Sequence, residues 1–524
     1  MKLLRRHRKF AYLIIFVYFY HSILAVFPPL QGDEASFWEW SRHLAFGYYA
    51  HPPMTAWLIA LVTNIFTTTQ YTIRLTSILL HIISLFAVYQ IALDISKKTT
   101  VSFVATIICS LMPLSLVFGT GITTDSSLIC FYTLSVLYVR RAVIDNNKAA
   151  WYLAALTCGG MLLSKFMAIL FFPGLFLFLV FNPKYRSLLF IKEPYLAFLI
   201  AWLIFSPFLI WNYQNEWLTF QFNFIVRHQN SGFDLLKPLI FLGAQLLAVS
   251  PVLWIILLLA LFRFLNPFQK KVKDTSCPTA DSIKMVSYVV AFPLLCFLLL
   301  SFNIRIGAHW LAAVYPASSV LITAWFYSRQ KFVQFERMIR RLEFKLALVT
   351  SVVLILGITA PMMKPSFFFP DRMLYTQQVG GDQPILSHYY GWRAVGEKIR
   401  QLEKEWASKP EGFFFTSKDY SIASMLGFYT PGHPQFYLMN FPKDGIHGKD
   451  ILIWQKGKKK IGANTIYVTD TYNSYHDRLN GFFKKTVELP PFIIRDDKGR
   501  ILRIFYFTAG IHYLGGEPDH LSVL

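Results

Sequence analysis

The sequence predicts a polytopic α-helical membrane protein that ends in a small α/β domain. Hydrophobic residues make up 55% of the 524 residues and charged residues only 15%, whereas soluble domains carry about 25% charged residues. Long apolar runs recur from the N-terminus to about residue 363. Beyond that point polar residues, proline and glycine become frequent. An ordinary soluble enzyme and a disordered chain are therefore both excluded.

The apolar runs predict about eleven transmembrane helices. The first run follows the basic sequence MKLLRRHRK and extends to about Leu30. It has no small-x-small cleavage site, so we interpret it as a span rather than a signal peptide. The other runs centre near residues 82, 110, 131, 156, 173, 203, 250, 293, 318 and 354. We find no internal repeat and expect no broken central helix.

Basic residues divide unevenly between alternate loops. Loops on the side of the N-terminus carry clusters: Arg5, Arg6, Arg8 and Lys9, then Lys97/Lys98, Arg140/Arg141, Lys184/Arg186, Lys270/Lys271/Lys273 and Arg337/Arg340/Arg341. The opposite loops carry few: Arg42, Arg74, Lys165, Arg227, Lys237 and Arg305. The positive-inside rule places the N-terminus in the cytoplasm and the C-terminal domain on the outer face. The net charge of +22 then reflects orientation and contact with anionic lipid headgroups rather than nucleic acid.

The C-terminal 160 or so residues show short alternating elements. Residues 389–407 have helical spacing, and the segments GFFFTS, TIYVTD and ILRIFYF are typical of strands. We therefore divide the chain into a membrane domain, residues 1–363, with an outer first loop at 31–55, and an outer α/β domain, residues 364–524. The five cysteines form no CxxC or zinc-ligand pattern, so neither a disulfide framework nor a metal site is expected.

The first outer loop, QGDEASFWEWSRHLAFGYYAHPPM, is acidic and aromatic. Adjacent side chains on a helix point about 100° apart, so Asp33 and Glu34 are not a facing acid/base pair. One carboxylate lines a cavity while the other caps the following helix. Alternatively both cap an interfacial helix whose aromatic residues lie at headgroup level: Trp38, Trp40, Tyr48 and Tyr49.

Further outer-side candidates carry isolated charges at membrane depth. Asp125, in GITTDSSL, is either an N-cap or a functional carboxylate. Lys165, in LLSKFMAIL, either snorkels to the surface or binds an anionic headgroup. Other polar and aromatic residues lie in Trp211–Trp217, in Arg227–His228 and in Arg305–Trp310.

Acids and cations gathered on one side suit a polyprenyl-phosphate sugar as substrate. Its phosphate requires cations, its sugar requires aromatic and amide contacts, and the acceptor hydroxyl requires a carboxylate base. The sequence contains no Walker A motif and no GxGxxG motif. A membrane lipid rather than a nucleotide is therefore the expected donor.

The first-loop segment GDEASFWEWSRHLAFGYYAHPPMTAWL resembles the signature of bacterial glycosyltransferases related to protein O-mannosyltransferases. This group has the GT-C fold, in families 39 and 83, and includes the lipid A aminoarabinose transferases. The resemblance continues in order through GITTDSSL, SKFMAIL, PFLIWNYQNEWLTFQFNF and AHWLAAVYPA, over about the first 325 residues. The segments YYGWRAVGEKI and MLGFYTPGHPQFYLMN are similar to the group's periplasmic tail.

The resemblance implies a periplasm-facing transferase in the bacterial inner membrane that needs no metal or other cofactor. It would take a sugar from a polyprenyl phosphate, usually undecaprenyl phosphate, and pass it to lipid A or lipopolysaccharide, another glycan or a protein. Asp33 matches the general base toward the acceptor hydroxyl. Glu34 matches its acidic neighbour, and Asp125 matches the acid of the second loop. Ala50 departs from the acidic residue usual at its position, which weakens the inference of a metal ligand there and of aminoarabinose as the sugar.

The remaining site residues are assigned by the same resemblance and by side-chain chemistry. The cations expected on the donor phosphate are His51, Arg74, Lys165 and Arg305. The residues expected to contact substrate are Trp38, Tyr49, Trp211, Asn212, Gln214, His309 and Trp310. Two alternatives stay open: a transporter or flippase of a lipid-linked glycan, and a non-enzymatic membrane assembly subunit.

Overall fold

The computed structural model describes residues 2–228, 231–266, 278–328, 342–363, 365–379, 383–417, 419–439, 448–470 and 479–516. The chain forms two compact units, each built from separate stretches of sequence. Unit 1 comprises residues 1–25, 51–216 and 228–358, and unit 2 comprises residues 26–50, 217–227 and 359–524. The basic clusters at residues 270–273 and 337–341 lie outside the described residues.

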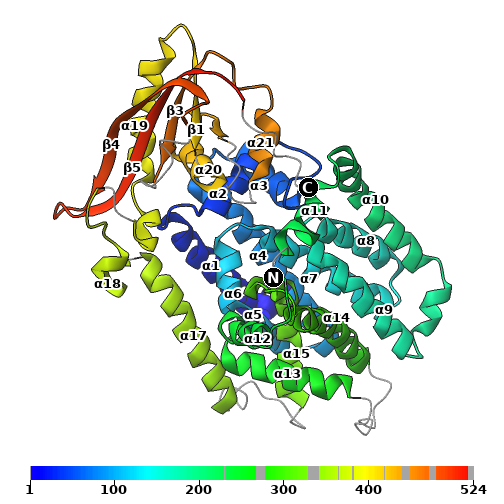
Figure 1. Ribbon diagram of the computed structural model, residues 1–524. Coiled ribbons are helices and arrows are strands. Elements are labelled where there is room, and N and C mark those ends of the chain that lie inside the picture. Colours follow the sequence, from blue (N-terminus) through cyan, green and yellow to red (C-terminus); the bar gives the residue numbers. More distant parts are fainter. Residues whose placement is uncertain are drawn as a thin grey trace. The chain divides into compact units, whose positions relative to one another are not determined.

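Unit 1 is an assembly of helices (Figure 1). Its first half contains α1 (Lys2–Val26), α3 (Met54–Ile65), α4 (Gln70–Ser96), α5 (Thr99–Ser110), α6 (Pro113–Thr120), α7 (Thr124–Ile144), α8 (Lys148–Leu162), η1 (Phe166–Leu170), α9 (Phe171–Phe181) and η2 (Arg186–Phe190). Its second half contains α10 (Glu193–Gln214), α12 (Leu236–Val249), α13 (Pro251–Leu265), α14 (Pro278–Ser301), η4 (Ala308–Val314), α15 (Tyr315–Ser328) and α17 (Leu342–Met363). The short η3 (Val226–His228) spans the sequence boundary between a stretch of unit 2 and a stretch of unit 1. Helix α7 packs against α4 and α8, and α14 packs against α9 and α15.

Among the described residues, seven helices are long and apolar enough to cross a membrane, and nine spans result if each of two bent helix pairs counts as one. Ten of the eleven predicted centres fall on helices, but the two near residues 156 and 173 fall on the shorter helices α8 and α9. The centre near residue 250 falls between α12 and α13. The predicted number therefore exceeds the number of full-length spans. A hydropathy run cannot distinguish a crossing from a short buried helix.

The expectation that no helix is broken is wrong. Helices α5 and α6 meet at 75°, and α12 and α13 meet at 110°. Each second helix begins with a proline, Pro113 or Pro251, which has no N–H to donate and disfavours helical geometry in the residue before it. Ser250 at the sharper bend has a φ of 97°. The apolar run near residue 250 is therefore two short helices rather than one straight span.

Unit 2 is an α/β domain. Its helices are α2 (Gly32–Arg42), α11 (Leu218–Phe224), α18 (Pro365–Phe368), η5 (Asp371–Met373), η6 (Ile385–Tyr389), α19 (Trp392–Ala407), α20 (Tyr420–Tyr429) and α21 (Lys449–Gln455). Its strands are β1 (Phe413–Ser417), β2 (Phe436–Leu438), β3 (Asn464–Thr469), β4 (Phe483–Arg495) and β5 (Ile501–Tyr513). The sheet order is β2-β1-β3-β5-β4; the pairs of β1 with β2 and β3 are parallel, and those of β5 with β3 and β4 are antiparallel.

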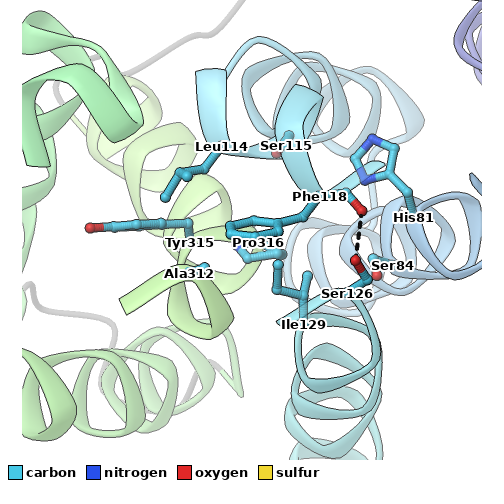
Figure 2. Close-up of a pocket in the computed structure, with 10 residues that line it drawn as sticks. All are labelled: His81, Ser84, Leu114, Ser115, Phe118, Ser126, Ile129, Ala312, Tyr315 and Pro316. Atoms are coloured by element: carbon cyan, nitrogen blue, oxygen red, sulfur yellow. Dashed lines mark hydrogen bonds between the residues drawn. The ribbon is translucent and has the colours of Figure 1, made fainter. Parts of the chain in front are cut away.

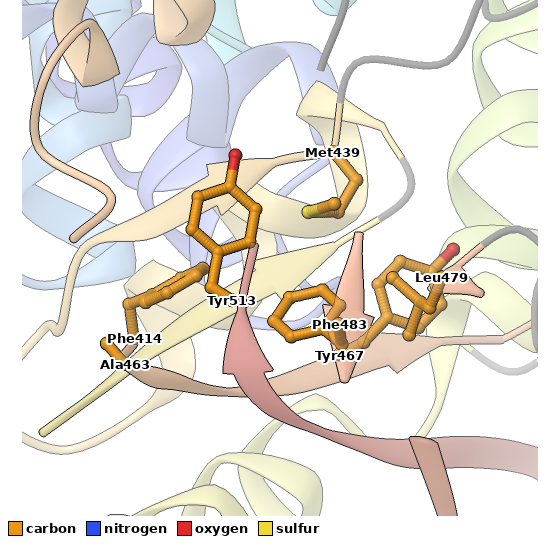
Figure 3. Close-up of a cluster of buried hydrophobic side chains, with 7 residues drawn as sticks. All are labelled: Phe414, Met439, Ala463, Tyr467, Leu479, Phe483 and Tyr513. Carbon is orange, nitrogen blue, oxygen red and sulfur yellow. The ribbon is translucent and has the colours of Figure 1, made fainter. Parts of the chain in front are cut away.

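The strands predicted from GFFFTS, TIYVTD and ILRIFYF correspond to β1, β3 and β5, and the predicted helix corresponds to α19. Every residue of β3 is buried, so that strand lies at the centre of the sheet. Seven buried side chains form one core of this unit (Figure 3): Phe414, Met439, Ala463, Tyr467, Leu479, Phe483 and Tyr513. This core fixes the sheet on which α20 rests.

Helix α2, from the first outer loop, packs on α20 within unit 2. A Cβ added at Gly32 would lie 1.7 Å from Ser421 Oγ, so only glycine allows this approach. The structure thus groups the first loop with the C-terminal residues, whereas the sequence-based division assigned it to the membrane domain. The close packing brings the loop's acidic residues beside α20.

Candidate functional site

The predicted site residues lie in both compact units. Unit 2 contains four of them: Asp33, Glu34, Trp38 and Tyr49. Unit 1 contains the others: His51, Arg74, Asp125, Lys165, Trp211, Asn212, Gln214, Arg305, His309 and Trp310.

The two adjacent acids of the first loop have different environments. Glu34 is buried, and its Oε2 accepts a hydrogen bond of 2.8 Å from the backbone N–H of Gln31, so this carboxylate closes the first turn of α2. Asp33 is exposed, and its Oδ1 accepts a hydrogen bond of 2.8 Å from the hydroxyl of Tyr420. Glu34 thus has the capping role that one interpretation gave to one of the two acids, and the expectation that the other acid lines a cavity stays a prediction.

Tyr420 lies at the start of α20, and its position depends on two neighbours. Asp419 is the N-cap of this helix and accepts from the N–H of Ile422 at 3.0 Å. Gly448, with a φ of +78°, leaves space for the Tyr420 ring, because a Cβ there would lie 2.2 Å from Tyr420 Cβ. Burial, followed by the charge of Asp33, raises the pKa of Tyr420, so its hydroxyl keeps the proton that it donates.

The rest of α2 is held by a polar cluster on its buried face. Glu39 accepts from Arg42 at 3.0 Å, and its Oε1 lies 3.3 Å from His43 Nε2, which also lies 3.0 Å from Gln435 Oε1. Burial raises the pKa of Glu39, but the His43 hydrogen bond and the Arg42 charge outweigh that effect, so the pKa lies below its ordinary value. Glu39 is therefore an ionised structural anchor.

Trp38 and Tyr49, which we predicted to contact substrate, are both buried. The Trp38 ring packs against Phe428 with a centroid distance of 5.0 Å. The Tyr49 ring packs against Phe222 at 4.9 Å. Within unit 2 these aromatic side chains contact protein, so their role toward substrate stays a prediction.

Asp125 and Lys165 are brought together inside unit 1. Lys165 Nζ lies 2.9 Å from Asp125 Oδ1 and 2.7 Å from Oδ2, and both side chains are almost fully buried. The N-cap of α7 is Thr123, so the carboxylate of Asp125 is not used as a cap. Lys165 does not snorkel to the surface in this structure. Sequence reasoning identified both residues but not that they form a pair.

The other predicted cations differ in accessibility. Arg74 is buried in α4 and donates to the carbonyl of Ala25 at 3.0 Å. His51 is half-buried, directly before Pro52, and Arg305 is exposed. Of these three, Arg305 is therefore the most accessible to an added anion.

The predicted substrate contacts of unit 1 are also uneven. Asn212 is fully buried and donates to the carbonyl of Phe208 at 3.0 Å, whereas Gln214 on the same helix is exposed. Trp310 is buried in η4, while Trp211 and His309 are half-buried. Gln214 and Arg305 are thus the exposed members of the predicted set in this unit.

A cavity with both polar and apolar walls lies among the helices of unit 1 (Figure 2). Figure 2 shows His81 beside the hydrogen bond that Ser126 donates to the carbonyl of Phe118 at 3.1 Å. The other residues that line this cavity are Ser84, Leu114, Ser115, Ile129, Ala312, Tyr315 and Pro316. In the part of the chain that the structure describes, no group of three or more His, Cys, Asp and Glu residues could hold a metal ion. The expectation that no metal is needed stays a prediction.

Sequence reasoning missed the residues of unit 2 that hold the first loop. Tyr420, Gln435 and Asp450 lie 387, 392 and 401 positions along the chain from their partners, as in the bond from Tyr420 to Asp33. Two close-packed glycines, Gly32 and Gly448, are the only sequence signal we recognise for this contact. A single sequence does not show which segments such glycines face.

The membrane part of the chain matches a known family. Residues 50–211 match the family model described as dolichyl-phosphate-mannose-protein mannosyltransferase. The matched residues make up less than a third of the chain. They include His51, Arg74, Asp125 and Lys165, whereas Asp33 and Glu34 precede them. The predicted family resemblance is confirmed.

A curated relative is the lipid A galacturonosyltransferase RgtD of Rhizobium johnstonii. It is 25% identical over 294 residues, which cover 55% of this chain and 59% of that protein. Two crystal structures of ArnT from Cupriavidus metallidurans have the same fold with a TM-score of 0.61. The apo structure is 13% identical, and the match covers 95% of this chain and 97% of that one. The structure with bound undecaprenyl phosphate is 14% identical, with 98% of both chains covered. These likenesses confirm the GT-C membrane fold.

Proposed function

We propose that this protein transfers a sugar from a polyprenyl phosphate to an acceptor hydroxyl at the outer face of the bacterial inner membrane. The family domain, the galacturonosyltransferase relative and the fold of an undecaprenyl-phosphate-binding protein support a lipid-linked donor. Lipid A or lipopolysaccharide is the favoured acceptor class, because the curated relative is named for lipid A. Another glycan or a protein is the alternative acceptor.

The observation that carries the proposal is the separation of roles between Asp33 and Glu34. Glu34 is buried in its own helix start, whereas Asp33 is exposed and held by Tyr420. A general base must reach the acceptor hydroxyl, and a hydrogen bond from a phenol fixes the carboxylate's direction. Asp33 is therefore the base in this proposal. Displacement at the anomeric carbon with inversion requires one such base.

On the donor side, cationic side chains stabilise the charge that develops on the leaving phosphate. Lys165, His51, Arg74 and Arg305 are the proposed cations. Asp125 holds Lys165 in a neutral pair, so burial of this lysine carries no net charge into the membrane domain. Exchange of the carboxylate for a phosphate oxygen would keep the ammonium group paired.

The test is the glycan composition of the envelope in cells that carry the wild-type protein, Asp33→Asn or no protein. Loss of a general base lowers the rate by about 10²–10⁴-fold, so Asp33→Asn should remove the product seen by mass spectrometry with wild type. Asp497→Asn, the same change at another exposed carboxylate of unit 2, is the matched control and should keep that product. Wild-type product levels with Asp33→Asn, at equal expression, would refute Asp33 as the base.

The bent pairs α5–α6 and α12–α13 favour a second candidate, a transporter of a lipid-linked glycan, because transporters use broken helices. A transporter moves its cargo without forming a glycosidic bond. Undecaprenyl phosphate released during incubation with purified donor lipid and acceptor therefore distinguishes the two: a transferase releases it, and a transporter does not.

A further inference from the structure

The segment Tyr48–Ala50 of the first loop is held by side chains from two distant parts of the chain. Thr219 Oγ1 donates to the carbonyl of Tyr48 at 2.8 Å. The N–H of Tyr49 donates to Asp450 Oδ1 at 2.6 Å. Asn223 Nδ2 donates to the carbonyl of Ala50 at 2.9 Å. Three consecutive residues thus have a backbone group bonded by a side chain, and all of these residues belong to unit 2.

The arrangement is built rather than incidental. Thr219 and Asn223 are four residues apart on α11, so they lie on the same face of that helix and reach both ends of the segment. Asp450 is 2% exposed and Thr219 is fully buried. Around the bonds, Tyr49, Leu218, Phe222 and Val226 form a buried apolar cluster that excludes water.

The burial of the Asp450 carboxylate is not explained by packing alone. Its Oδ1 bonds the loop, whereas its Oδ2 is buried without a hydrogen-bond partner among the described residues. A buried polar atom without a partner is unfavourable, so the bond to Tyr49 offsets part of that penalty. A residue that served only to fill space at this position would be apolar.

We infer that Thr219, Asn223 and Asp450 are positioning residues that fix the backbone of Tyr48–Ala50, and thereby the approach of the next residue, His51, to the donor phosphate. This inference rests on the proposed function, because His51 is a phosphate cation only there. The three side chains need not touch substrate. They set the direction in which the loop enters the His51-Pro52-Pro53 sequence, which two prolines make stiff.

The experiment measures hydrogen–deuterium exchange and the binding of undecaprenyl phosphate on the full-length protein in nanodiscs. A net hydrogen-bond contribution corresponds to about a fivefold change in an equilibrium constant. Asp450→Ala should speed exchange of the Tyr49 amide and weaken undecaprenyl phosphate binding, each by about fivefold. Asp450→Asn retains an acceptor oxygen and should change neither. Thr219→Val tests the same segment should Asp450→Ala fail to fold.

Gln455 provides a matched control on the same helix, α21. It is also buried, and it exchanges hydrogen bonds of 2.8 and 2.9 Å with the backbone of Leu438 in β2 rather than with the first loop. Gln455→Leu should therefore leave Tyr49 exchange and undecaprenyl phosphate binding unchanged, even if it lowers stability.

The outcomes separate the inference from the proposed function. Unchanged Tyr49 exchange with Asp450→Ala would show that these side chains do not hold the loop. Faster exchange with unchanged undecaprenyl phosphate binding would show that they do not position a donor site, and the proposed function would stand. Absence of undecaprenyl phosphate binding by the wild type would overturn the donor assignment and the inference together.

Discussion

Replacement of Asp450 by Asn should make the protein more stable above neutral pH. Burial is the main cause that raises the pKa of Asp450, from an ordinary 3.8 to about 7, and the bond from the Tyr49 N–H opposes it. The titratable groups that face this carboxylate are the buried phenols of Tyr48 and Tyr49, and Lys449 precedes it in the chain. Burial lowers the pKa of Lys449. Asparagine keeps an acceptor oxygen without a charge.

The sign follows from which state holds the proton. Between pH 4 and pH 7 the folded protein keeps Asp450 protonated while the unfolded chain has lost that proton, so the free energy of unfolding falls as the pH rises through this window. The difference between 3.8 and about 7 corresponds to about 4 kcal/mol at full ionisation. Asparagine does not titrate, so Asp450→Asn should lack this loss.

Thermal unfolding of both proteins in detergent at pH 5.0 and pH 8.0 tests the reasoning. The stabilising effect of Asp450→Asn should be smaller at pH 5.0, where only part of the loss has occurred, and should grow to several degrees in Tm at pH 8.0. Asp497→Asn, at an exposed position, should show no such growth. The same Tm difference at both pH values would mean that Asp450 does not titrate in this range, and it would refute the argument.

Three further predictions concern other parts of the molecule. Lys165→Gln leaves the buried carboxylate of Asp125 without its cation and should lower the free energy of unfolding by about 3–5 kcal/mol. The double variant that also carries Asp125→Asn should recover most of the lost stability. No recovery in Tm would contradict a direct pair. Tyr420→Phe removes the hydrogen bond to Asp33 and should lower product formation by about fivefold with an unchanged Tm; full activity in the envelope assay would exclude a role in orienting Asp33. A cysteine at exposed Lys498 should react with an impermeant maleimide in spheroplasts, and one at exposed Lys98 should not; labelling at Lys98 would reverse the predicted topology.

Local patterns predicted much of the fold. Hydropathy runs located most helices of unit 1 but not α3, and short runs of aromatic and β-branched residues located β1, β3 and β5. Strand β2 has only three residues, too few to show alternation, and β4 contains Pro490 and Pro491, which argue against a strand. The register shift in the pairing of β4 with β5 lies between Leu489 and Phe492 and spans these prolines, which is where a strand tolerates them.

From the sequence, the candidate site was predictable only at residues whose charge stands out from apolar or aromatic neighbours. Asp33, Asp125 and Lys165 are charges in apolar or aromatic surroundings, so they were recognised from sequence. Asp450 was not, because its segment GKDILIWQ is a common mixture of polar and apolar residues. Its significance comes from burial beside Tyr49, and burial depends on a tertiary contact across 401 positions of sequence.

The interrupted sequence of unit 2 has a consequence for the construction of hybrid proteins. Its stretches 26–50, 217–227 and 359–524 are separated in sequence by residues 51–216 and 228–358 of unit 1. An exchange of only the C-terminal stretch with that of a homologue would place a foreign surface against Gly32, where no Cβ fits, and foreign groups against Tyr49. A functional chimaera should therefore require all three stretches to be exchanged together. The part of this protein that can be exchanged as a unit is a set of separate segments rather than the C-terminal residues alone.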